Sequence, residues 1–161
     1  MIRNAIMADV PEMHRLITHH AELNRMLFRS HADLYEHLRD FFVCVEATGG
    51  GPRVLGCVAL ELVWRDLAEI KSLAVDEEHR GRGIGRQLVR ATLDEARRLG
   101  LARVFALTRE RPFFDKLGFR VVAKETLPHK VWTDCVRCPL QEHCDEIAMV
   151  LDLENSGDSS T

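Results

Sequence analysis

Short apolar runs, some of them alternating with polar residues, recur along this chain of 161 residues. Such runs, bounded by turn residues, predict β-strands. The strands are predicted at residues 2–7, 41–46, 54–62, 69–75, 104–107, 119–123 and 147–153. Apolar residues three and four positions apart predict α-helices between them. The helices are predicted to start after Asp9, to span 31–39 and 111–117, and to run from the segment 80–85 to Gly100.

The predicted order is one strand, two helices, three strands, a helix, a strand, a short helix and two strands. Asp9 is expected to cap the first helix, with Pro11 in its first turn and Glu12 three residues after the cap. Residues 1–153 are expected to form a single domain without internal repeats. The polar, serine-rich segment 154–161 is predicted to be a disordered tail.

The segment 80–85 reads Arg-Gly-Arg-Gly-Ile-Gly and stands between a predicted strand and a predicted helix. Glycine has no Cβ and accepts a positive φ, so neighbouring backbone N–H groups can converge on a ligand. The N-terminal end of the helix adds a positive potential, and Arg80, Arg82 and Arg86 crowd the same turn. The segment therefore predicts a pocket for an anion such as a pyrophosphate. A tight turn without a ligand is the alternative.

Two common phosphate-binding loops do not fit this segment. The nucleoside-triphosphate loop ends in Gly-Lys-Ser/Thr, whereas Gly85 is followed by Arg86 and Gln87. The dinucleotide fingerprint lies in the first strand-to-helix turn, and Arg86 prevents a G-x-G-x-x-G pattern here. Neither kind of nucleotide loop is therefore expected.

Composition and charge favour a cytoplasmic enzyme. Hydrophobic residues make up 46% of the chain and charged residues 29%, which allows a core of ordinary size. The net charge of −3 provides no overall basic field for nucleic acid. No apolar run approaches the roughly 20 residues that span a membrane, and the N-terminus has no secretory pattern. Five cysteines, an odd number, do not suggest a secreted disulfide framework.

Arg80, Gly83 and Gly85 form the pattern Arg-x-x-Gly-x-Gly. Together with the preceding segment 72–76, this resembles the acetyl-CoA loop of the GCN5-related N-acetyltransferases, the GNAT family, whose order of elements is also the predicted one. The resemblance implies an α/β (α+β) fold, the GNAT acyl-CoA N-acyltransferase fold, with a mixed, mostly antiparallel sheet of about seven strands flanked by four helices. Acetyl-CoA is the implied co-substrate. The residues implied in binding it are Leu73, Ala74, Val75, Arg80, Gly81, Arg82, Gly83, Ile84, Gly85, Arg86, Phe114 and Lys116.

Residues 111–119, which end in Leu-Gly-Phe, are similar to the stretch where these enzymes place a short helix beside the pantetheine arm. Phe113 and Phe114 are either cofactor contacts or core aromatics. Many family members carry a tyrosine near the position of Phe114 as the general acid for the departing thiolate. The only tyrosine of this chain is Tyr35, far away in sequence, so the usual acid is missing.

A narrower resemblance comes from the segments 26–30, 127–135, 138–139 and 144–149. They look like the short, stand-alone N-acetylglutamate synthases of arginine biosynthesis, which lack the amino-acid-kinase domain and do not rely on the tyrosine. The resemblance implies direct acetyl transfer from acetyl-CoA to the α-amino group of L-glutamate, or of glutamine, in a ternary complex. The product would be N-acetylglutamate, at the first step of arginine biosynthesis.

Acetyl transfer needs a neutral amine, a polarised thioester carbonyl and a proton for the thiolate. Glu69, on the strand before the glycine loop, is the candidate base for the ammonium proton, directly or through water. A solvent-facing strand acid is the alternative. Thr108, at the carboxyl end of the next strand, is the candidate that helps to protonate the thiolate. A backbone N–H among residues 73–75 would polarise the carbonyl.

A substrate such as glutamate carries two carboxylates, which call for cationic partners. Arg29, Lys71 and Lys130 come from separate segments that this fold would bring to one cleft. Lys71 shares its strand face with Glu69 by the period of two. Each of the three could instead be an ordinary surface charge. Together they form the predicted carboxylate clamp.

The chain also carries part of a zinc-binding pattern. Its cysteines and candidate histidines are Cys135, Cys138, Cys144, His129 and His143. The second half of a zinc motif is absent, so no metal is expected, and a redox-sensitive thiol cluster or simple packing is favoured. Cys44 and Cys57 are expected to be buried in strands. Five histidines on or near the first two predicted helices are expected at the surface or at helix caps: His14, His19, His20, His31 and His37.

Two other functions stay open at this point. A same-class alternative is an acetyltransferase acting on another small amine or on a protein N-terminus. A different class is a module that senses acyl-CoA or zinc through Cys135, Cys138 and Cys144 without turnover. A small amino-acid substrate is the expected partner, with neither nucleic acid nor membrane involved, and a homodimer is left open.

Overall fold

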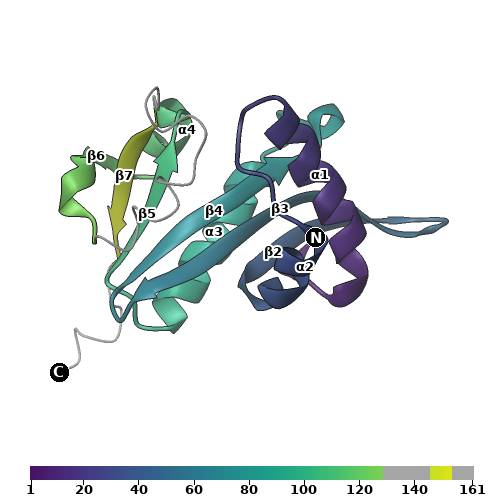
Figure 1. Cartoon of the computed structure of the whole chain (residues 1–161), viewed down its shortest axis with the longest axis horizontal. Helices are drawn as coiled ribbons and strands as arrows, with labels where there is room; N and C mark the ends of the chain where they lie inside the picture. Colours follow the sequence, from purple (N-terminus) through teal and green to yellow (C-terminus); the bar gives the residue numbers. More distant parts are fainter. Residues whose placement is uncertain (129–145, 154–161) are drawn as a thin grey trace. The chain divides into compact units, whose positions relative to one another are not determined.

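The computed structural model describes residues 1–128 and 146–153 of the chain. Within these residues it contains seven strands and four α-helices in the predicted order (Figure 1). The strands are β1 Ile2–Asn4, β2 Phe41–Thr48, β3 Gly51–Trp64, β4 Leu67–Val75, β5 Arg103–Thr108, β6 Arg120–Val122 and β7 Ile147–Asp152. The helices are α1 Val10–Glu22, α2 His31–Glu36, α3 Ile84–Arg98 and α4 Arg111–Asp115.

The strands form one mixed sheet in the order β1-β2-β3-β4-β5-β7-β6. Antiparallel pairs are formed by β1 with β2, β2 with β3, β5 with β7, and β6 with β7. The pair β4 and β5 is parallel, with Glu69 opposite Phe105. A parallel pair requires a long crossover connection, which α3 supplies here. The predicted mixed, mostly antiparallel sheet of the GNAT fold is confirmed.

The chain divides into two compact units, which are described separately. The first comprises Met1–Leu60 and Lys71–Asp94. In its core, the apolar face of α1 packs with residues of α2, β2 and β3. Cys57 of β3 belongs to this cluster, whereas a Cβ added to the neighbouring Gly56 would lie 3.0 Å from Leu88 and 3.1 Å from Ile84 of α3. Successive strand residues point to opposite faces, so α1 and α3 cover the two faces of β3 in this unit.

The second unit comprises Glu61–Ile70 and the chain from Glu95 onward. Its described residues build a smaller core from strands β3, β4, β5 and β7 and the segment after β6. The buried members are Val63, Leu67, Phe105, Leu127, Ala148 and Val150. Beside it, Phe114 of α4 is buried and meets Phe119 edge to face, with ring centroids 5.1 Å apart.

Three local predictions need correction. The strand expected over 2–7 ends at Asn4, and a 3₁₀ turn covers Met7–Asp9. The helix expected over 31–39 ends at Glu36, because His37 leaves helical geometry and its ring approaches the Asp33 carbonyl to 3.0 Å. A short 3₁₀ turn follows at Leu38–Asp40. Asp9 does occupy the cap position of α1, but its carboxylate accepts from Arg3 and from the Ile6 N–H instead of from the helix.

Among the described residues, no helix combines the length and the apolar character needed to cross a membrane.

Candidate active site

The predicted acetyl-CoA loop follows β4 in the first unit. A 3₁₀ turn, η3 (Glu77–His79), leads into it, and α3 begins directly after it at Ile84. Gly81 and Gly83 take φ values of +81° and +77°, which residues with a side chain rarely adopt. A Cβ added to Gly81 would meet no atom within 4 Å, so its backbone lies open to a ligand.

This loop has the features that a pyrophosphate requires. The first turn of α3 has backbone N–H groups without partners inside the helix, and the helix dipole makes this end positive. Arg80, Arg82 and Arg86 are all exposed around the same turn. Exposed glycine backbone, a helix N-terminus and three guanidinium groups therefore fit the phosphates of acetyl-CoA.

The strand β4 is irregular at Ser72. This residue has a φ of +55°, a left-handed conformation that is uncommon outside glycine and interrupts the strand alternation. The alternation that places Lys71 on the face of Glu69 therefore ends directly after Lys71. The N–H groups of Leu73, Ala74 and Val75, expected to polarise the thioester, follow this irregularity.

Cys57 supports the irregular backbone from β3. Its thiol lies 3.6 Å from the Ser72 carbonyl oxygen, toward which the S–H is directed. Complete burial raises the pKa of the Cys57 thiol to about 12, although the charge of Arg29 acts in the opposite direction. The thiol is therefore neutral at physiological pH and acts as a weak donor. Burial of both Cys44 and Cys57, as predicted, is confirmed.

Glu69 is buried, with 7% of its surface exposed. The alternative of a solvent-facing strand acid is therefore wrong. The reason is that Leu67, Ala68, Glu69 and Ile70 are all buried, so β4 has no solvent-facing side over this stretch. A carboxylate at such a position is costly to bury without a function or partners.

Thr108 lies at the carboxyl end of β5, as expected, and is also buried. Its Oγ1 atom accepts a hydrogen bond from the Glu110 N–H at 2.8 Å. This bond orients the hydroxyl group and leaves its proton available for donation. Glu69 and Thr108 both belong to the second unit.

Arg29 is held by three groups of the first unit. Its Nε donates to Asp33 Oδ2 at 2.5 Å, and its Nη1 donates to Ser72 Oγ at 3.2 Å. The guanidinium also lies over the Phe41 ring, 5.0 Å from the centroid. Only 14% of the Arg29 side chain is exposed. An arginine buried and oriented in this way is not an ordinary surface charge.

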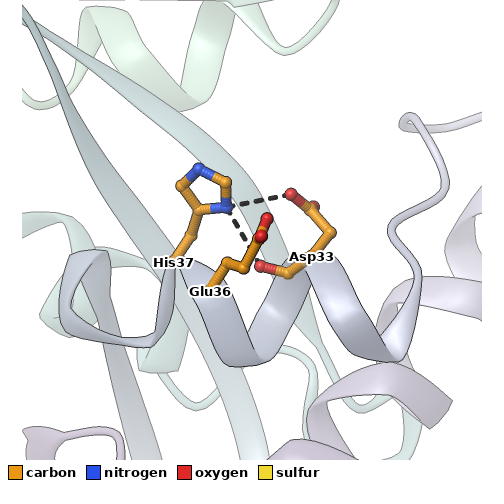
Figure 2. A group of neighbouring side chains, drawn as sticks. All are labelled: Asp33, Glu36 and His37. Atoms are coloured by element: carbon orange, nitrogen blue, oxygen red, sulfur yellow. Dashed lines mark hydrogen bonds and ion pairs between the residues drawn. The ribbon is translucent and has the colours of Figure 1, made fainter.

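Asp33 forms a second ion pair on its other side (Figure 2). Its Oδ1 lies 2.9 Å from His37 Nδ1. Burial alone would raise the pKa of Asp33, but the hydrogen bond and charge of Arg29, with those of His37, outweigh it and lower this pKa from 3.8. Asp33, Glu36 and His37 have the spacing of metal ligands, the one such group in residues 1–128 and 146–153. Since both Asp33 oxygens already have partners, Arg29 and His37, we interpret the group as a polar network within the fold.

The other predicted residues are distributed as follows. Lys71 is half-buried on β4, and Lys116 is exposed at the end of α4. Phe114 packs against Phe113 and Phe119, so core packing is observed, whereas cofactor contact stays a prediction. The predicted residues that lie outside the described part of the chain are Lys130, His129, Cys135, Cys138, His143 and Cys144.

Sequence reasoning missed the role of His20 and did not single out Arg25 or Glu77. His20 was expected at the surface or at a cap but is buried, because its ring reaches the Val75 carbonyl at the end of β4. Arg25 contacts both the His20 ring and Glu77. No local pattern could reveal the contacts with Val75 and Glu77, since they join residues more than 50 positions apart.

The fold and the glycine loop together correspond to a known family. Residues 7–119 match the acetyltransferase (GNAT) family, and the chain therefore belongs to it. An uncharacterised N-acetyltransferase of Chlorobaculum tepidum is 43% identical over 149 residues, which cover 92% of this chain and 94% of that protein. The amino-acid acetyltransferase of Mycobacterium tuberculosis is 36% identical over 137 residues, covering 85% and 78% of the two chains.

Two solved structures resemble the described fold closely. Rv2747 from Mycobacterium tuberculosis, in complex with CoA and NLQ, superposes with a TM-score of 0.82 at 31% identity, covering 96% of this chain and 99% of that one. N-acetylglutamate synthase from Neisseria gonorrhoeae, complexed with CoA and N-acetyl-glutamate, gives a TM-score of 0.84 at 28% identity, covering 96% of this chain and 35% of that one. The protein is accordingly an acetyl-CoA-dependent N-acetyltransferase.

Proposed function

We propose that this enzyme transfers the acetyl group of acetyl-CoA to the α-amino group of L-glutamate, with glutamine as a second acceptor. The product is N-acetylglutamate, at the first step of arginine biosynthesis. The similarity to the amino-acid acetyltransferase of Mycobacterium tuberculosis and to the Neisseria gonorrhoeae synthase complexed with N-acetyl-glutamate supports an amino-acid acceptor. The chain resembles the short form of these synthases, and its similarity to Rv2747 extends over 96% of this chain and 99% of that one.

The observation that carries the proposal is the immobilised guanidinium of Arg29. Its Nε donates to Asp33 and its Nη1 to Ser72, and a guanidinium carries five N–H donors, so further donors remain for a ligand. A carboxylate is the ligand that accepts two parallel hydrogen bonds from a guanidinium. Because the cation is already oriented, little conformational entropy is lost when a carboxylate binds.

The remaining cations extend this recognition. Lys71 lies on β4 next to Ser72, the residue that Arg29 contacts. Lys130 is assigned to the same clamp by the sequence resemblance alone. A dicarboxylate acceptor requires one more cationic partner than a neutral amino acid does.

The chemistry uses the groups of β4 and β5. Glu69 accepts a proton from the acceptor ammonium, and the neutral amine then forms an N–C bond with the thioester carbonyl carbon. The C–S bond breaks and its electron pair leaves on the sulfur as thiolate, the nitrogen passes its second proton to that thiolate, and Glu69 releases the first proton to solvent. Thr108 donates a hydrogen bond to that thiolate while it collects a proton. Backbone N–H groups of residues 73–75 stabilise the charge on the carbonyl oxygen.

Release of free thiol from acetyl-CoA, measured across the standard amino acids, simple amines and peptides with a free N-terminus, tests the proposal. Glutamate, followed by glutamine, is expected to give the highest kcat/KM. A preference for another amine or for a peptide would assign the enzyme to a different acceptor. CoA binding without turnover of any acceptor would favour a sensing module.

A further inference from the structure

A chain of contacts outside the groups used above connects the end of α1 with the start of the acetyl-CoA loop. His20 Nε2 lies 2.9 Å from the carbonyl oxygen of Val75, the last residue of β4. His20 Nδ1 lies 3.2 Å from Nη1 of Arg25. The same Nη1 donates to Glu77 Oε1 in η3. All of these residues belong to the first unit.

The hydrogen-bond chemistry determines the state of the His20 ring. Arg25 can only donate, so Nδ1 of His20 must be the acceptor, and Nε2 carries the hydrogen that is donated to Val75. Burial lowers the pKa of His20 from 6.5; the hydrogen bond to Val75 acts against this, and the charges of Arg25 and Arg80 act with it. The ring is therefore neutral at physiological pH, with Nε2–H as its tautomer.

Glu77 is shared between cations of two segments. Its Oε1 contacts Arg25 from the segment after α1 and lies 3.8 Å from Nη2 of Arg80 in the glycine loop. His19 Nε2 lies 3.5 Å from the other oxygen. The hydrogen bond from Arg25 lowers the pKa of Glu77, which therefore remains a carboxylate. A carboxylate that pairs with Arg80 competes with any phosphate for the same guanidinium.

We propose that His20 and Arg25 are positioning residues for acetyl-CoA. His20 fixes the Val75 peptide, and Arg25 competes with Arg80 for the same Glu77 oxygen, which keeps the 3.8 Å contact between Arg80 and Glu77 weak and lets Arg80 turn to a phosphate. Because these roles rest on the acetyl-CoA site proposed above, the experiment must separate failure of the positioning from failure of the site. The affinity for CoA, measured by calorimetry, is suitable because it does not depend on the identity of the acceptor.

A double-mutant cycle tests the role of Arg25. Arg25→Gln is expected to weaken CoA binding about 3- to 10-fold at low salt, because Glu77, without Arg25, then pairs more closely with Arg80. Glu77→Gln is expected to leave the affinity unchanged or to tighten it up to about threefold. In the Glu77→Gln background, Arg25→Gln should change the affinity by less than about twofold. Loss of the same factor in both backgrounds would overturn the proposal, since Arg25 would then act without Glu77.

Ionic strength provides a readout that a purely structural role would not affect. All side chains of the cycle are at least partly exposed, and added salt screens such charges. The loss caused by Arg25→Gln should therefore shrink at about 0.5 M salt. A loss independent of salt would contradict competition for Arg80.

His20 is tested with a pair of variants. His20→Gln retains an N–H donor at the distance of Nε2 and is expected to bind CoA within about threefold of the parent. His20→Leu removes the donor and should weaken binding by about tenfold or more. If His20→Leu fails to fold, the test rests on His20→Gln combined with the Arg25 cycle. Equal affinity of a folded His20→Leu variant would exclude a positioning role for the ring.

Two controls complete the design. Arg98→Gln and Glu95→Gln alter an exposed ion pair in the last turn of α3, about 20 Å along the helix from the loop, and should leave CoA affinity unchanged. Gly83→Asp places a carboxylate in the loop and should abolish measurable binding. Retained binding in Gly83→Asp would reject the loop as the cofactor site. If Gly83→Asp abolishes CoA binding but Arg25→Gln has the same effect with and without Glu77→Gln, only the positioning role is rejected.

Discussion

Asp33 holds Arg29 in place: Asp33 Oδ2, in the first turn of α2, accepts from Nε of Arg29, four positions earlier, at 2.5 Å. The opposite oxygen of Asp33 faces His37, which limits rotation of the carboxylate. Arg29 therefore has its orientation determined before any ligand arrives. Such a preorganised cation is the kind of group that selects a carboxylate by geometry as well as by charge.

Asp33→Asn should therefore raise the KM for the amino-acid acceptor about 5- to 20-fold, because the amide keeps an acceptor but loses the negative charge that strengthens the hydrogen bond from Arg29. The KM for acetyl-CoA should change little. Glu36→Gln is the matched control, since Glu36 belongs to the same acidic group (Figure 2), whereas Asp33 is the residue that accepts from Arg29 Nε. Steady-state kinetics with both substrates varied would measure the two KM values. Equal effects of the two substitutions would mean that the charge of the segment matters and the Arg29 contact does not.

Glu69→Gln should lower kcat by roughly 10²- to 10⁴-fold at neutral pH, because the amide cannot accept the ammonium proton. Glutamine has nearly the same shape, so the fold and CoA affinity should be preserved. The loss should be smaller at high pH, where the acceptor amine is already neutral in solution. A variant that retains most of its turnover would assign proton removal to another group.

The order of the elements could be predicted from the sequence because each strand or helix buries an apolar face. Helix α1 illustrates this, since Met13, Leu16 and Ile17 recur at helical spacing and all lie in the core. The glycine loop was equally legible, because Gly81 and Gly83 are needed where φ is positive. Periodicity and backbone requirements of this kind are local properties of the chain.

The left-handed turn within β4 could not be predicted, because serine, the residue at position 72, does not indicate a positive φ as glycine does. The burial of Glu69 was equally hidden, because a strand buried over four successive residues shows no useful alternation. The contacts of His20 with Val75 and of Arg25 with Glu77 depend on how distant segments pack. The features that could not be predicted from the sequence are therefore mostly tertiary contacts, and they include much of the candidate site.

Asp76 provides a test of acid stability. Its carboxylate accepts from the Glu78 N–H at 3.0 Å and from Arg53 at 3.2 Å. Burial raises the pKa of Asp76, but these partners outweigh it, so its pKa in the folded protein lies below the ordinary 3.8. The unfolded chain therefore binds this proton more readily than the folded protein does. Ionised Asp76 stabilises the folded state fully above pH 3.8, and this stabilisation is lost as the pH falls through the lower pKa of the folded protein.

Asp76→Asn keeps a side-chain acceptor for Glu78 and removes only the charge. The variant should be less stable at pH 7 by about 1 kcal/mol, and its free energy of unfolding should depend less steeply on pH below about 5. Urea unfolding at a series of pH values measures both quantities. Parallel pH profiles for the two proteins would show that Asp76 contributes nothing through its charge.

Arg29→Ala should weaken the use of glutamate by about 2–4 kcal/mol in apparent transition-state binding, because a carboxylate loses its oriented partner. Arg29→Lys, the matched control, keeps the charge but not the planar fork, and should recover only part of the loss. Lys130→Ala should act in the same direction with a smaller effect, since lysine offers a point charge. The KM for acetyl-CoA should barely change in all three variants. If only the KM for acetyl-CoA rises, these cations bind the phosphates of the cofactor and not the acceptor. If the parent enzyme shows no preference for acidic or amide amino acids, glutamate is not the acceptor.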